Sequence, residues 1–175
     1  MSGLLARIWR RLRGPGQWYV LWVFHAKFMI GVTGLVRDRD GRVLLLRHRM
    51  WPSGRQWGLP TGYARKRERF EDTVVREVKE ETGLDVTVGQ LVNMTSGYKL
   101  RLEVAYAAEL VGGVLTLDSF EVLEARWFAL EELPPGVLDA HRLMIEKNTA
   151  WYTPRTDRPR GPHDDLPGPE RMAQR

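Results

Sequence analysis

Residues 62–84 read GYARKRERFEDTVVREVKEETGL and are the most informative stretch of the sequence. Charged residues dominate it, but Val74 and Val78 lie one helical turn apart, as on the buried face of an amphipathic helix. We therefore predict a helix over residues 70–82. Gly83 would end this helix, because glycine readily adopts the left-handed conformation found just beyond helix C-termini.

The predicted helix gathers three carboxylates on one side. Successive residues of an α-helix advance by about 100°, so Glu77, Glu80 and Glu81 fall within roughly a 100° arc. Their mutual repulsion favours a bound cation, and hard divalent ions such as Mg²⁺ or Mn²⁺ take oxygen ligands of this kind. Arg76 lies one turn before Glu80, where an i,i+4 ion pair could orient that carboxylate.

A solvated, charged helix face is the alternative interpretation of residues 76–81. The register of the surrounding residues argues against it, because the stretch resembles, position for position, the signature of the Nudix hydrolases. This signature is G-x5-E-x7-R-E-U-x-E-E-x-G-U, where U is aliphatic, and residues 62–84 match every specified position. The clear resemblance covers residues 28–133 and rests on weaker features outside the signature.

The resemblance implies both a fold and an activity. The fold is of the α/β (α+β) class, an α/β/α sandwich with a mixed sheet in which the signature forms a loop–helix–loop. Nudix enzymes are known as metal-dependent hydrolases of a nucleoside diphosphate linked to another moiety. We therefore expect water to attack a phosphorus of a small-molecule nucleotide while Mg²⁺ or Mn²⁺ neutralises the phosphate charge.

Two other functions stay open. One is a nucleoside triphosphate (house-cleaning) pyrophosphatase, which needs a similar positive charge around its cleft. The other is a Nudix-fold binding module, which should have lost signature carboxylates, or a membrane-associated module built around residues 1–25, which is compatible with an enzyme. No signature carboxylate is lost here, so an enzyme is favoured.

Catalytic roles follow from the family positions. The resemblance assigns Glu77, Glu80 and Glu81 as metal ligands, one of them doubling as base, Glu68 as an assisting acid linked to Arg76, and the backbone at Thr61 or Gly62 as a further ligand. Two positions depart from the family pattern, since Thr61 and Arg67 stand where glycine is usual. Neither departure removes a carboxylate, but both put the loop geometry and the substrate preference in doubt.

Five further residues are candidates outside the signature. They are Glu121 and Glu124 as an additional acid, and Arg47, Trp57 and Tyr98 as contacts to the phosphate or the base. A solvated loop acid, a surface arginine at a strand end and a core aromatic are the respective alternatives.

The composition is that of one globular domain. The chain has 175 residues, of which 43% are hydrophobic and 28% charged, enough for one sizeable core. The net charge of +5 suits a polyanionic substrate but is too small to indicate nucleic acid as a partner. The absence of cysteine excludes disulfides, zinc thiolate sites and thiol nucleophiles, and a cytoplasmic location fits it.

Residues 1–25 form a separate basic and aromatic segment that we expect to be helical. Residues 1–13 contain four arginines and no acid, and residues 18–24 are all apolar or aromatic. A membrane span is not expected, because Lys27 would lie near its middle, and no small-residue cleavage site marks a signal peptide. We expect the segment to pack on the domain; a homodimer contact and a peripheral membrane contact are the alternatives.

The rest of the chain divides into a domain over residues 26–151 and a tail over residues 152–175. Strands are predicted at 28–36, 43–47, 85–94, 99–110 and 125–128, and a last helix near 138–148. Turns are predicted at Asp40-Gly41 and Gly112-Gly113. The tail has almost no aliphatic residues, and we expect it to be disordered.

Overall fold

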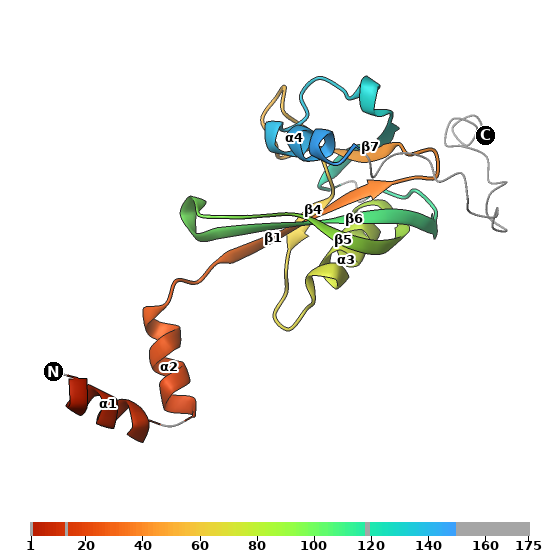
Figure 1. Ribbon diagram of the computed structural model, residues 1–175. Coiled ribbons are helices and arrows are strands. Elements are labelled where there is room, and N and C mark those ends of the chain that lie inside the picture. Colours follow the sequence, from red (N-terminus) through yellow and green to blue (C-terminus); the bar gives the residue numbers. More distant parts are fainter. Residues whose placement is uncertain (1, 13, 118–119, 150–175) are drawn as a thin grey trace.

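The computed structural model describes residues 2–12, 14–117 and 120–149. Within these ranges it contains four α-helices, two short 3₁₀ helices and seven strands (Figure 1). In chain order they are α1 (Ser2–Arg11), α2 (Pro15–Phe24), β1 (Met29–Arg37), β2 (Val43–His48), β3 (Trp57–Gly58), β4 (Thr61–Tyr63), α3 (Phe70–Thr82), β5 (Leu84–Ser96), η1 (Tyr98–Leu100), β6 (Arg101–Gly113), β7 (Val122–Phe128), η2 (Leu130–Glu132) and α4 (Asp139–Lys147).

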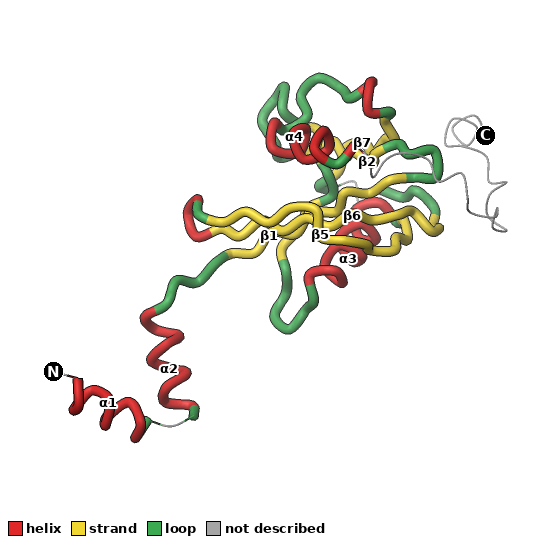
Figure 2. The backbone as a smooth tube through the Cα atoms, viewed as in Figure 1, coloured by secondary structure: helices red, strands yellow, loops and turns green. Residues whose placement is uncertain are grey.

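Strand β1 organises a mixed sheet. It pairs in parallel with β6 and antiparallel with β2 and β4, and the main strand order is β3-β2-β1-β6-β5. Strand β7 pairs with β2 outside this path. The long β5–β6 hairpin extends beyond the rest of the sheet on the side where the N-terminal helices lie (Figure 2).

Both faces of the sheet are buried, which explains the near-continuous apolar runs of β1 and β2. Val32, Val36, Leu44 and Leu46 point to one face, where Val74 and Val78 of α3 complete a core cluster. Leu35, Val43 and Leu45 point to the opposite face and pack with Ile145 of α4. The predicted α/β/α sandwich is therefore confirmed, with α3 and α4 on opposite sides of the sheet (Figure 1).

Most predicted elements are present, and helix α3 has the predicted bounds. Two expectations about these elements were wrong. Lys99 and Leu100 belong to a turn with positive φ rather than to a strand, and Gly112-Gly113 lies within β6 rather than in a turn. Strands β3 and β4 were not expected, because segments of two and three residues carry no detectable alternation.

The N-terminal helices extend away from the domain (Figure 1). Helix α2 buries none of its residues, so the expected packing of this segment on the domain does not occur in the described part of the chain. Among the helices of the described residues, none is both long and apolar enough to cross a membrane. The tail predicted at residues 152–175 lies outside the described residues.

Candidate active site

The signature folds into a strand, a loop and a helix at one edge of the core. Strand β4 pairs with β1, residues 64–69 form the loop, and α3 returns across the sheet. Gly83 ends α3 with φ 70°, and its N–H donates to the Lys79 carbonyl, as the sequence predicted. The carboxylates of the loop and of α3 are thereby brought to the same edge.

Gly62 fits closely against Glu77. A Cβ atom added at Gly62 would lie 1.9 Å from Glu77 Cδ and 2.0 Å from its Oε1. No L-residue other than glycine can stand there while the Glu77 side chain keeps its position. The glycine therefore lets the carboxylate rest directly on the backbone of β4, next to the carbonyl groups predicted to bind metal.

Arg76 lies at the centre of the site and uses all five of its N–H donors. Nε donates to Glu68 Oε1 at 2.7 Å and Nη2 to Glu68 Oε2 at 3.0 Å, a bidentate pair. Nη1 donates to Glu77 Oε1 and, at 3.0 Å, to Glu80 Oε2. Nη2 also donates to the Tyr63 carbonyl at 3.1 Å. The predicted salt link to Glu68 and the predicted i,i+4 pair are both present.

Glu68 is held from three directions. Besides Arg76, its Oε2 accepts the Arg65 backbone N–H at 2.8 Å and lies 3.0 Å from the Thr73 hydroxyl. The hydrogen bonds from Arg76, more than any other contact, lower the pKa of Glu68 to about 2. The same pair raises the pKa of Arg76 above its ordinary value, so both groups are charged at neutral pH.

Glu80 and Glu81 differ in exposure. Glu80 is about half exposed and accepts from Arg65 Nη2 at 3.2 Å as well as from Arg76. Glu81 is buried, one turn beyond Glu77 on the same face of α3. Glu68, Glu77 and Glu80 thus share the guanidinium groups of Arg65 and Arg76. Three carboxylates against two cations leave an excess of negative charge at this edge.

The donor set suits a hard divalent cation, but the described side chains do not form a closed cage. Carboxylate oxygens beside exposed backbone are the ligands that Mg²⁺ and Mn²⁺ prefer. In the described residues, however, no group of three or more acidic or histidine side chains converges on one point. Arg76 explains this, because its guanidinium stands between Glu77 and Glu80. Binding of a cation would require these carboxylates to turn away from Arg76.

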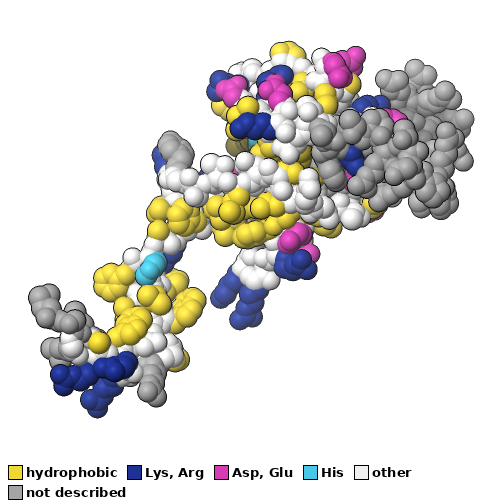
Figure 3. Space-filling view, viewed as in Figure 1, with side chains coloured by type: hydrophobic (Ala, Val, Ile, Leu, Met, Phe, Trp, Pro, Cys, Tyr) yellow, Lys and Arg dark blue, Asp and Glu magenta, His cyan; other side chains and the backbone are white. Residues whose placement is uncertain are grey.

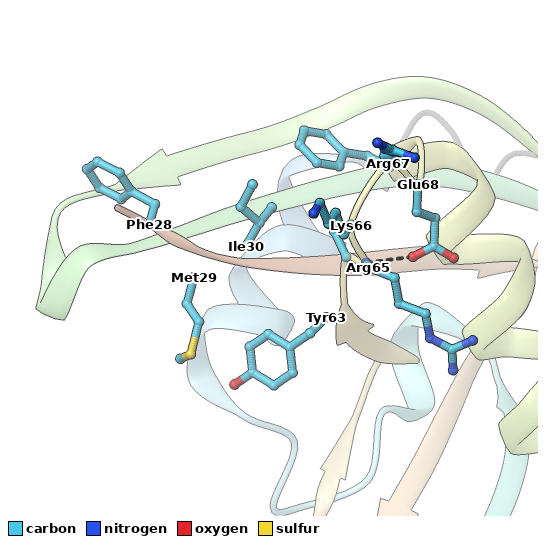
Figure 4. A pocket seen from close by; sticks show the side chains of 10 residues that line it. Phe28, Met29, Ile30, Tyr63, Arg65, Lys66, Arg67 and Glu68 are labelled. Carbon is cyan, nitrogen blue, oxygen red and sulfur yellow. Dashed lines mark hydrogen bonds between the residues drawn. The ribbon is translucent and has the colours of Figure 1, made fainter. Parts of the chain in front are cut away.

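An open hollow of about 600 Å³ adjoins the loop (Figure 4). Its apolar wall comes from the start of β1 and from α3, and its polar wall from β4 and the loop. The lining residues are Phe28, Met29, Ile30, Tyr63, Ala64, Arg65, Lys66, Arg67, Glu68 and Phe70. Volumes of this order accommodate a nucleotide-sized ligand.

The candidates outside the signature form a second group on neighbouring strands. Arg47 of β2 stands opposite Trp57 of β3 and Glu124 of β7, and its Nε lies 3.2 Å from Glu124 Oε2. No hydrogen bond or ion pair of the described residues joins Arg47 or Glu124 to Glu68, Glu77 or Glu80. Trp57 packs edge-on against Phe128, with ring centroids 5.3 Å apart.

Two further candidates lie in turns. Glu121 is exposed in the connection just before β7, and its carbonyl accepts the Arg49 N–H. Tyr98 lies in η1 at the tip of the β5–β6 hairpin, and its side chain is outside the described part of the structure. The functional roles suggested for both stay predictions.

The sequence reasoning missed Thr73 and the backbone of Arg65, which complete the shell of Glu68. Thr73 could have been found, because it precedes Glu77 by four residues and so shares its helix face. The Arg65 N–H could not, because it depends on a loop conformation in which Arg67 has φ 67°.

A mixed sheet between helices, with an acidic loop and helix at its edge, defines the class of this protein. Residues 27–148 match the NUDIX domain family. ADP-ribose pyrophosphatase from Methanocaldococcus jannaschii is 29% identical over 127 residues, which cover 70% of this chain and 73% of that protein. The NAD-capped RNA hydrolase NudC from Vibrio atlanticus is 32% identical over 96 residues, 54% of this chain but 35% of NudC. The crystal structure of a MutT Nudix hydrolase from Burkholderia pseudomallei superposes with a TM-score of 0.61 at 26% identity and covers 70% of this chain and 98% of that one.

The chain therefore belongs to the Nudix family, as the signature predicted. Members of this family are hydrolases that act on phosphoanhydride bonds, and the chain is a Nudix hydrolase.

Proposed function

We propose that this hydrolase is a metal-dependent pyrophosphohydrolase that cleaves a nucleoside diphosphate linked to another moiety. The observation that carries the proposal is that the signature carboxylates Glu68, Glu77 and Glu80 gather around Arg76, beside an open and partly basic hollow. The similarity to an archaeal ADP-ribose pyrophosphatase supports a substrate of this class.

Glu77, Glu80 and Glu81 would hold the metal, together with backbone oxygen near Thr61 and Gly62. A bound Mg²⁺ or Mn²⁺ would supply charge neutralisation at the diphosphate and an activated water. Arg76 and Glu68 would act through the ligands rather than on the substrate. Glu68 holds the guanidinium of Arg76, which pairs with Glu77 and Glu80 and balances part of their negative charge until a cation takes its place. One of the three α3 carboxylates accepts the proton of the attacking water.

Both the polar and the apolar wall of the hollow would contact the substrate. Arg65 and Lys66 are exposed at the mouth and carry the charge that a diphosphate requires. Phe28, Ile30 and Phe70 offer apolar surface to a base or to another planar group. A substrate with groups on both sides of a diphosphate uses this arrangement more fully than a triphosphate does.

A substrate panel tests the proposal. The purified chain is assayed with ADP-ribose, nucleotide sugars, dinucleotides and the common nucleoside triphosphates, each with Mg²⁺, with Mn²⁺ and with a chelator. We expect hydrolysis only with metal, and a kcat/KM for a diphosphate-linked compound more than about tenfold above that of any triphosphate. If the kcat/KM of a triphosphate exceeds that of every diphosphate-linked compound by this margin, the substrate class is a nucleoside triphosphate. Hydrolysis in the presence of the chelator would contradict the metal-dependent mechanism.

A further inference from the structure

The two N-terminal helices and the segment after them, residues 2–12 and 14–27, form an arm with an unusual apolar surface. Helix α2 carries apolar side chains around most of its circumference, yet buries none of them. Trp18 is 69% exposed and Phe24 81%, and Tyr19 and Trp22 are also exposed. A helix that is apolar all round is normally covered by other apolar groups. Something outside the described chain must cover this one.

The charged residues of the arm are all basic. The first acidic residue of the sequence is Asp38, while Arg7, Arg10 and Arg11 lie on α1 and Lys27 follows α2. Lys27 Nζ lies 4.3 Å from the centroid of the Trp22 ring, so charge and aromatic surface adjoin one another. A second copy of the arm would bring like charges together without acids to offset them. A surface that is both anionic and partly apolar would cover the apolar side chains of α2 and offset the positive charge of the arm.

The dimensions of α2 fit the interface of a bilayer rather than its interior. A helix of ten residues is about 15 Å long, half of what is needed to cross the hydrocarbon core. Tryptophan and tyrosine side chains concentrate at the boundary between headgroups and acyl chains, and arginines remain among the headgroups. The arm offers both kinds of side chain within two adjacent helices.

The rest of the molecule supports the same contact. Lysine and arginine side chains gather at α1 and at the loop before α3, and both groups project to the same side of the molecule (Figure 3). The arm joins the domain at Phe28 and Met29, which line the hollow beside the signature. We propose that the arm binds the surface of a membrane that contains anionic lipids and holds the hollow beside the signature close to that surface. This inference goes beyond the proposed hydrolysis and does not depend on it.

Co-sedimentation of the full chain with vesicles tests the proposal. One set is phosphatidylcholine with about one-third phosphatidylglycerol, and the other is phosphatidylcholine alone. We expect binding to the anionic vesicles at least about tenfold stronger than to the neutral ones, and much weaker binding at about 1 M salt, where charges are screened within about 3 Å. Absent binding, or equal binding to the two sets, would overturn the proposal.

Two double variants identify the surface. Arg10→Glu/Arg11→Glu and Trp18→Ser/Phe24→Ser should each weaken binding at least about tenfold. Their matched controls, Arg126→Glu/Lys147→Glu and Met50→Ser/Leu143→Ser, change exposed residues of the same kinds on the domain and should bind like the parent. If a control variant loses as much vesicle binding as the matched arm variant, the assignment of the binding surface to the arm is wrong. A dimer in light scattering that Trp18→Ser/Phe24→Ser dissociates, without vesicle binding, would instead assign the surface to a second copy.

Discussion

Arg76 holds Glu68 by two hydrogen bonds, Nε to Oε1 at 2.7 Å and Nη2 to Oε2 at 3.0 Å, across the boundary between the signature loop and helix α3. The three remaining N–H groups of the same guanidinium bind Glu77, Glu80 and the Tyr63 carbonyl. One side chain thus joins strand, loop and helix. It also places three carboxylates that would otherwise repel one another.

Arg76→Lys should be strongly disruptive despite the conserved charge. An ammonium group offers three donors in place of five and cannot form the bidentate pair with Glu68. We expect a loss of about 3–6 kcal/mol in the free energy of unfolding, the cost of two hydrogen bonds to a charged group. Urea denaturation measures the loss, with Arg126→Lys at an exposed position as control. A loss equal to that of the control would show that the guanidinium geometry is not required.

Gly62→Ala should remove activity through Glu77 while the domain remains folded. The added Cβ would lie 1.9 Å from Glu77 Cδ, so the carboxylate must turn away from β4. We expect kcat to fall at least about a hundredfold, as for loss of a group that takes part in proton transfer. Gly112→Ala is the matched control, because a Cβ there meets no atom within 4 Å. If Gly62→Ala keeps normal kcat at saturating Mg²⁺, the position of Glu77 is not important for catalysis.

Glu81→Gln should abolish turnover with little effect on folding. The change keeps the size of the side chain and removes one charge from a site with excess negative charge. Steady-state kinetics should show a kcat at least about a hundredfold lower at saturating metal. Asp72→Asn, on the exposed side of the same helix, should leave kcat unchanged. Activity near that of the parent in Glu81→Gln would remove Glu81 from the proposed ligand set.

The sequence predicts the signature helix to the residue because several local signals agree there: apolar spacing, a glycine at the C-terminus and charges in helical register. The five donor contacts of Arg76 were only partly predictable. Its i,i+4 partner Glu80 follows from helix geometry alone, whereas the contacts to Tyr63 and to both Glu68 oxygens depend on how the loop folds back.

Elements defined by tertiary contacts escaped prediction for the same reason. Strand β4 exists because β1 offers it hydrogen-bonding partners, not because residues 61–63 favour a strand. The pairing of Arg47 with Glu124 likewise results from the register between β2 and β7, which no local pattern specifies. Exposure of α2 could not be read from its composition, which is that of a buried helix.

Arg67→Gly should stabilise the protein. Arg67 is exposed in the signature loop and has φ 67°, a left-handed conformation that costs a residue with a Cβ about 1–2 kcal/mol. Glycine adopts it freely but loses more entropy on folding, about 0.5–1 kcal/mol. We expect a net gain of about 0.5–1 kcal/mol in urea denaturation. Arg39→Gly, where φ is not positive, should give no gain, and equal effects of the two changes would contradict a conformational cause.

His48 should make the protein less stable in mild acid. Its ring is buried and stacks on Trp51, with centroids 4.0 Å apart, and burial lowers its pKa to about 4 from the usual 6.5. Between these values the unfolded chain takes up a proton that the folded chain does not, so stability is greatest above pH 6.5 and falls until pH 4. The loss would be on the order of 3 kcal/mol.

Urea denaturation across this pH range, with the parent and with His48→Phe, measures the effect of His48 separately. Phenylalanine keeps a ring against Trp51 but cannot titrate, so the variant should lose much of the dependence on pH. Some dependence should remain, because burial also lowers the pKa of His141 to about 4. His25→Phe is the matched control, because it makes the same change of residue type on the exposed arm and should leave the slope of stability against pH as in the parent. An unchanged slope in His48→Phe would mean that other groups govern acid stability.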